Sequence, residues 1–168
     1  IGQIAKQLGL PEGATKQAVA AISPALTRGI ERNASKPEGL GSLLDALKKG
    51  NHAQYVEKPE TIGREESVAD GNAILGHIFG SKDVSRNVAG NAARETGIDA
   101  SILKKMLPML GTVVMGALSK QAGSGGQLSG LKDGKASGDP LAMLTGFLDS
   151  NKDGSATDEI LNMAKKYF

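Results

Sequence analysis

The chain has 168 residues, with 20 Lys and Arg against 18 Asp and Glu, and it has no cysteine. This length fits one domain, or two small ones that share a core, and is enough to bury most of the surface that the unfolded chain exposes. The absence of cysteine excludes disulfides, thiolate catalysis and zinc–thiolate sites. The net charge of +2, with the basic residues in scattered pairs, argues against nucleic acid as a partner.

Aromatic residues make up 3% of the chain and 23 residues are Gly, so the core must rest on aliphatic side chains, with small residues where helices approach closely. The longest apolar run, from Met106 to Leu118, contains Pro108 and Gly111 and falls short of the ~20 residues that a membrane span needs. We therefore expect a soluble protein with no membrane span. A cytoplasmic location is favoured unless a signal peptide was removed before Ile1.

Three helices are expected in residues 1–50. Apolar residues within 1–8 have the i, i+3, i+4, i+7 spacing of a helix, and Gly9 follows as a C-cap candidate. A second apolar stripe runs from Ala14 to Ile30, where Pro24 should kink or interrupt the helix. Leucines mark a third, short helix that ends at Gly50. We assign residues 1–50 to an N-terminal helical repeat.

Residues 51–69 lose this periodicity and are mostly polar, which predicts a loop or linker, with Glu65 as an alternative start of the next helix. A short apolar helix follows, with Asp70 or Asn72 available as its N-cap and the sequence Ile74-Leu75-Gly76-His77-Ile78-Phe79-Gly80. We assign residues 70–122 to a central helical repeat.

Two more helical patterns complete this central repeat. A helix of small residues within 84–93 ends at Gly97, and Asp99 or Ser101 can cap the next helix. That helix covers 102–118 and is apolar around most of its circumference, so it should be the most buried element.

The last part of the chain divides at a stretch rich in Gly and Ser. Residues 123–138 have the composition of a flexible linker. Residues 139–168 read as a helix, a polar loop and a last helix over 160–168. We assign them to a C-terminal helix-loop-helix.

Shifting the sequence on itself by 88 positions aligns related residues along the first two repeats. The aligned pairs include Gly9 with Gly97, Leu10 with Ile98, Val19 with Leu107, Ile22 with Leu110, Leu26 with Val114, Ile30 with Leu118, Leu40 with Leu128, Leu43 with Leu131 and Asp45 with Asp133. Helical sequences also align by periodicity alone, which is the alternative. We predict an all-α fold, a compact multi-helix array built from two similar repeats, with 160–168 as a short capping helix.

The central repeat also carries a family resemblance. Its motifs are Ile74 to Gly80, Val88-Ala89, Gly97-Ile98, Leu107-Pro108 and Val114-Met115-Gly116. With them, the chain resembles the YidB-like bacterial family of unknown function. The resemblance is clear over the C-terminal two thirds, residues 149–168 included, and reaches the first fifty residues only through the repeat. It implies an all-helical bacterial protein and no reaction.

One stretch has the chemistry of a metal site. Residues 149–155 place oxygen ligands at positions 1, 3 and 5 of an EF-hand loop, glycine at position 6 and a carbonyl at position 7, between two helical patterns. Ile160 stands at position 12, where a bidentate Glu is expected, and an acid arrives earlier, as in shortened calcium loops. The candidate calcium ligands are Asp149, Asn151, Asp153, Ser155, Asp158 and Glu159.

The same residues also fit a simpler structure. Asp149 to Gly154 can form a turn in which Ser155 caps the last helix and Asp158 completes a capping box. One loop can both bind calcium and cap the last helix. We expect calcium, at this loop alone, as the one candidate cofactor.

Other candidates are weaker. His77 lies between glycines on an apolar helix and should be a core or helix-contact histidine, and His52 stands alone in the 51–69 stretch. Residues 76–82 superficially resemble a phosphate loop, but Gly-x-x-x-Gly-Ser-Lys is one residue short and has no Ser or Thr after Lys82, so we reject that assignment. The sequence contains no recognisable catalytic constellation.

Three functions remain open. A non-enzymatic protein-interaction or assembly module, through an unknown protein partner or self-association, fits the repeat and the lack of reactive groups. An enzyme would use His77 with Asp70 or Asp83, which requires these side chains to converge in a pocket. Nucleic-acid binding, through helices that resemble helix-turn-helix units around Gly97, ranks behind both because of the low net charge.

Overall fold

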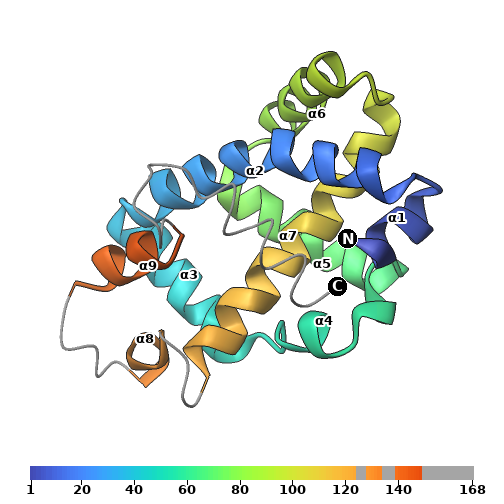
Figure 1. The fold of residues 1–168 in the computed structure, drawn as a ribbon. Coiled ribbons are helices and arrows are strands. Elements are labelled where there is room, and N and C mark those ends of the chain that lie inside the picture. Colours follow the sequence, from blue (N-terminus) through green and yellow to red (C-terminus); the bar gives the residue numbers. More distant parts are fainter. Residues whose placement is uncertain (124–127, 134–138, 149–168) are drawn as a thin grey trace.

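The computed structural model describes residues 1–123, 128–133 and 139–148, and this part of the chain is all-α, as predicted (Figure 1). Its elements, in chain order, are α1 (Gly2–Leu8), α2 (Glu12–Ala34), α3 (Pro37–Lys49), α4 (Gln54–Glu57), the 3₁₀ turn η1 (Pro59–Thr61), α5 (Glu65–Phe79), α6 (Lys82–Thr96), α7 (Ala100–Ala122), α8 (Ser129–Asp133) and α9 (Pro140–Leu148). The predicted capping helix over 160–168 lies outside the described residues.

Helix α7 is the axis of the fold. It packs against α1 to α6 and against α8, and runs through the middle of the molecule in Figure 1. Every residue from Met106 to Ser119 is buried. A helix that is apolar around its whole circumference can be stable only inside a protein core or a membrane. The prediction that this is the most buried element is therefore confirmed.

Helix α7 is also longer than the sequence suggests. It has 23 residues, because it begins at Ala100 and ends at Ala122, two residues before and four residues after the predicted limits. Pro108 and Gly111 lie inside the helix, as they do in the predicted range. By length and composition it is the one helix in the described part of the chain that could cross a membrane, with a mean hydropathy of 1.3 over 18 residues. In this structure 78% of that window is buried inside the protein, so its apolar surface is already covered by the other helices.

The contact between α5 and α7 is a backbone contact. A Cβ atom at Gly71 would fall on the carbonyl group of Pro108, well inside the 3.0 Å that real Cβ atoms respect. On the facing helix, a Cβ at Gly111 would lie 3.3 Å from the carbonyl oxygen of Gly71. The two helices therefore cross with no side chain between them at this point.

Most helix ends agree with the sequence. Gly9 and Gly97 end α1 and α6 in the left-handed region, with φ of 64° and 73°. Asp99 caps α7 by accepting a hydrogen bond of 2.7 Å from the backbone N–H of Ser101. Gly50 is the C-cap of α3.

Two helices extend past the predicted limits. Pro24 does not interrupt α2, which is one helix of 23 residues. Helix α5 begins at the alternative start, Glu65, so Asp70 and Asn72 lie inside the helix and do not cap it. This leaves the side chain of Asp70 free for a tertiary contact.

Two stretches predicted as loop or linker contain short helices. Residues 51–69 hold α4, η1 and the start of α5, and Tyr55, Val56 and Ile62 are buried there. Helix α8 lies within 123–138, where Leu128 and Leu131 are buried. These few apolar residues anchor chain segments whose composition is otherwise polar. The division into five segments stays a prediction, and residues from all five share one hydrophobic core.

The internal repeat also stays a prediction. Helices α2 and α7 have 23 residues each and start 88 positions apart, at Glu12 and Ala100. Each follows a short turn after a glycine in the left-handed region. Two helices of equal length at this offset are the geometry that a duplication would leave.

The contact of α5 with α7 leads to a prediction with a matched control on the same helix. Gly71→Ala should lower the free energy of unfolding by about 1–3 kcal/mol, because the new Cβ must displace the α7 backbone. Gly76→Ala meets nothing within 4 Å and should raise it by up to about 1 kcal/mol through helix propensity. Urea denaturation measures both. Equal effects of the two substitutions would contradict the close approach.

Candidate functional site

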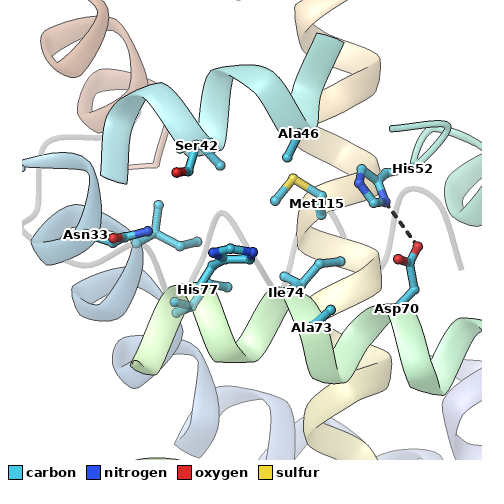
Figure 2. A pocket seen from close by; sticks show the side chains of 12 residues that line it. Asn33, Ser42, Ala46, His52, Asp70, Ala73, Ile74, His77 and Met115 are labelled. Carbon is cyan, nitrogen blue, oxygen red and sulfur yellow. Dashed lines mark ion pairs between the residues drawn. The ribbon is translucent and has the colours of Figure 1, made fainter. Parts of the chain in front are cut away.

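Helices α3 and α5 both pack on α2 and α7 but make no extensive contact with each other. A cavity of about 160 Å³ lies between them (Figure 2). We call it the α3–α5 cleft. It is lined by Ile30, Asn33, Ser42, Leu43, Ala46, His52, Asp70, Ala73, Ile74, His77, Ile78 and Met115. Most of these side chains are apolar, and both histidines of the chain are among them.

One end of the cleft holds a polar cluster of three residues. The hydroxyl of Tyr55 donates a hydrogen bond of 2.7 Å to Oδ2 of Asp70, and Nδ1 of His52 lies 3.3 Å from the same oxygen. The histidine contact is an ion pair only when the imidazole is protonated. Nδ1 makes no well-formed hydrogen bond, although it is buried. The firm link in this cluster is therefore the one between Tyr55 and Asp70.

Burial and this hydrogen bond change the acidity of Tyr55. Burial raises the pKa of its hydroxyl well above the ordinary value, and the hydrogen bond to Asp70 and the negative charges of Asp70 and Glu66 raise it further. An anionic phenolate beside a carboxylate would be repelled. Tyr55 is therefore a neutral donor that ties α4 to α5.

Glycines hold the imidazole of His52 in place. A Cβ at Gly50 would collide with the ring, and one at Gly116 would lie 2.8 Å from the backbone oxygen of His52. The ring stacks on Tyr55, with 6.3 Å between the ring centroids. The prediction of a solitary loop histidine is wrong, because this short segment folds against α7 and buries it. No periodic signal in residues 51–57 indicates that contact.

His77 lies at the other end of the cleft. It is exposed, so the expectation of a core histidine is wrong, and the alternative of a helix-contact histidine stays a prediction. Its face of α5 points toward α3, which stands off from α5 at this point. Asp70 and His77 are seven residues apart, about 10.5 Å along the helix, and Figure 2 shows Ala73 and Ile74 between them. The two side chains share the cleft without touching.

The other proposed partner of His77 lies elsewhere. Asp83 is exposed on α6 and pairs with Arg86 at 2.9 Å. The hydroxyl of Ser42, in the cleft, donates to the backbone oxygen of Glu38 at 2.9 Å. Of the two candidate acids of the enzyme hypothesis, only Asp70 lies in the same cleft as His77. Among the described residues of the cleft, no nucleophile is oriented by a base.

The predicted calcium ligands all lie outside the described residues: Asp149, Asn151, Asp153, Ser155, Asp158 and Glu159. Within the part of the chain that the structure describes, no three His, Asp or Glu side chains are arranged to hold a metal ion. The calcium site stays a prediction.

Comparison with known proteins identifies one family. Residues 1–121 match the family model described as a bacterial protein of unknown function (DUF937). The match includes the first fifty residues, where we expected only an indirect resemblance, and it ends before residues 149–168, where we expected a direct one. No curated protein and no solved structure matches the chain. Every residue that lines the cleft lies inside the matched segment.

The raised pKa of Tyr55 predicts an alkaline loss of stability. Above about pH 10 the unfolded chain loses the Tyr55 proton while the folded chain keeps it, so this contribution is complete below pH 10 and falls by up to ~1.4 kcal/mol per pH unit above it. Tyr55→Phe should lower the free energy of unfolding by about 1 kcal/mol at neutral pH and make its alkaline decline shallower. Urea denaturation across this range measures both.

Lysine titration affects the parent and the variant alike, so the difference between the two pH profiles isolates Tyr55. Parallel profiles would contradict the assigned hydrogen bond.

Proposed function

The chain belongs to the DUF937 family, the YidB-like bacterial proteins of unknown function, and we propose that it is a non-enzymatic protein-interaction module that receives an apolar side chain of its partner in the α3–α5 cleft. The family description names no reaction and no ligand. The proposal rests on one observation, a small and mainly apolar cavity that exposed residues such as Ala73 and His77 connect to the surface.

The volume of the cleft indicates which occupants can fit, a whole small molecule or a single side chain. Its volume of about 160 Å³ is below the ~300–1,000 Å³ of most small-molecule and cofactor sites. It is close to the ~150 Å³ of an engineered apolar cavity that binds benzene. One ring or one branched aliphatic group fits this space, whereas a nucleotide or a flavin does not.

The rest of the described surface favours insertion of a partner side chain into the cleft over docking of the partner on a flat apolar patch. No large hydrophobic residue is exposed on the part of the chain that the structure describes. A partner therefore meets no flat apolar patch there, but its side chain can reach Ile74 and Met115 through the cleft. Anchors of this kind, one side chain in a pocket with polar groups around it, dominate the affinity of many interfaces.

The charged residues beside the cleft restrict which partner sequences can bind. Arg32 and Lys36 line a shallow hollow together with His77, which also lines the cleft. No carboxylate is among the residues of that hollow. An acidic residue next to the apolar anchor would meet positive charge at this position. We therefore propose a partner segment with a large apolar residue beside Asp or Glu.

A second candidate function is an enzyme. It is favoured by the presence of His52, Asp70 and His77 around one cavity, since a histidine beside a carboxylate can act as a general base. Asp70 is also the acceptor of the Tyr55 hydroxyl, and that structural role explains its position without catalysis. Turnover of an ester or amide panel that disappears in His77→Ala would favour the enzyme over the interaction module.

The interaction proposal predicts which peptides bind. Peptides selected from a random display library should carry a large apolar residue next to an acid, and Ala73→Leu should weaken the best of them at least tenfold by filling the cleft. Ala69→Leu, on the same helix and also exposed but outside the cleft, is the matched control. Fluorescence anisotropy gives the affinities. Peptides that bind Ala73→Leu and the parent equally would refute this site.

Self-association would give a different result. In that case the parent would form a dimer in sedimentation experiments, and Ala73→Leu, but not Ala69→Leu, would dissociate it.

We also propose that residues 149–159 bind one calcium ion, on the ligand pattern of the sequence alone. Calcium at 100 times its dissociation constant should stabilise the folded chain by ~2.7 kcal/mol, a shift of several degrees in the melting temperature. The shift should vanish in the double variant Asp149→Ala, Asp153→Ala and persist in Asp83→Ala. If the parent itself does not respond, these residues form only a capped turn.

A further inference from the structure

We propose that a second cavity, on the other side of α5, binds a small molecule that carries a phosphate group. This cavity has a volume of about 400 Å³ and lies between α5, α6 and α7. Its residues on α5 are Asn72, Leu75 and Gly76, whereas the cleft uses Asp70, Ala73, Ile74, His77 and Ile78. At 100° per residue these two sets lie on nearly opposite faces of the helix. The proposal is therefore independent of the interaction proposed above.

Three cations from two helices converge on this cavity. Lys82 and Arg86 come from α6 and Lys104 from α7, and no Asp or Glu is among the lining residues. Like charges that converge without a counter-charge repel one another, and a bound anion removes that repulsion. The low net charge of the whole chain conceals this local excess.

Nearby carboxylates do not neutralise the three cations. Arg86 pairs with Asp83 at 2.9 Å, but both side chains are more than half exposed and water screens them. Lys104 attracts Asp99, whose carboxylate is already bonded to the N-terminus of α7. Lys82 has no ion pair with another described residue.

The polar groups of the cavity match a phosphate monoester. This group has nearly two negative charges at neutral pH and three terminal oxygens that accept hydrogen bonds. Besides the cations, Ser81, Ser85 and Asn72 line the cavity and can donate to those oxygens. Ser81 accepts a bond from the backbone N–H of Val84 at 3.3 Å, which leaves its hydroxyl hydrogen free to donate.

The volume favours a phosphorylated molecule over free phosphate. About 400 Å³ lies within the ~300–1,000 Å³ of small-molecule sites. Leu75 and Leu107 are buried and give the cavity an apolar floor, and Gly76 contributes no side chain to fill it. An apolar body attached to the phosphate would lie on this floor.

The same residues explain the superficial phosphate-loop pattern. Gly76, Ser81 and Lys82 belong to Gly-x-x-x-Gly-Ser-Lys, and all three line the cavity. The segment joins helix α5 to helix α6, whereas a phosphate loop of nucleotide-binding proteins joins a strand to a helix. The rejected motif is thus not a nucleotide loop. We place its basic and hydroxyl groups in a cavity built by three helices.

Isothermal titration with phenyl phosphate tests the proposal, with phenol as the uncharged comparison. The parent should bind phenyl phosphate saturably and at least tenfold more tightly than phenol. The double variant Lys82→Gln, Lys104→Gln should weaken binding at least tenfold. Lys105→Gln, exposed on the same helix as Lys104 but outside the cavity, should leave it unchanged.

A second variant fills the cavity without removing charge. Gly76→Met places a side chain where nothing lies within 4 Å of a Cβ, so it should abolish binding while far-ultraviolet circular dichroism keeps its helical signal. Binding that is undetectable in the parent, that is equal for phenol, or that survives both the lysine and the Gly76 variants would overturn the proposal. Lysine-dependent binding of a single-stranded oligonucleotide, with none of phenyl phosphate, would replace it with a nucleic-acid surface.

Discussion

The direct backbone contact between α5 and α7 is the constraint on which the rest of this structure depends. Gly71 and Gly111 remove the side chains that would otherwise separate the two helices, and the carbonyl group of Pro108 occupies the space that a Cβ at Gly71 would need. Helix α7 is buried on every side, so its position is determined by the whole core. Once α5 is seated on it at this distance, the remaining faces of α5 are fixed relative to α3, α6 and the 51–57 segment.

Those remaining faces border two cavities of different chemistry. The α3–α5 cleft is small and mainly apolar, with polar groups at its ends, and the second cavity is larger and basic, with no lining carboxylate. All lining residues of both lie within residues 1–121, the segment that matches the family. The part of the chain beyond that segment contributes buried leucines to the core, among them Leu128 and Leu144. The two cavity proposals therefore concern the segment that matches the family, whereas the proposed calcium loop lies beyond it.

Asp70 shows how a structural residue and a site residue can be the same. It accepts the Tyr55 hydroxyl, which attaches the α4 segment to α5, and it also forms one end of the cleft. Removing its carboxylate would change the wall of the cleft as well as its polarity. Its location alone is thus a poor argument for catalysis, whereas the exposed His77 makes no hydrogen bond or ion pair with another described residue that would explain its position.

Local sequence determined most of the helices. Apolar periodicity placed α1, α2, α3, α6, α7 and α9, and the glycines at 9, 50 and 97 marked where three of them end, because these signals act within one or two turns. Composition did not predict the structure of segments in which a few buried apolar residues decide whether the chain packs against the core. Tyr55, Val56 and Ile62 are enough to fold a polar stretch against the core, and Pro24 and Pro108 are held inside helices by their surroundings.

Tertiary structure alone decided the sites. His52 contacts Asp70 across 18 positions of sequence, and Lys104 lines the same cavity as Lys82, 22 positions away. Such arrangements depend on the distances and angles at which helices cross, which no helical period encodes. The exposure of His77 follows from the gap between α3 and α5, a property of two helices and not of either sequence. The sequence by itself established an all-α member of a bacterial family, and only the packing around α7 brought its polar side chains together.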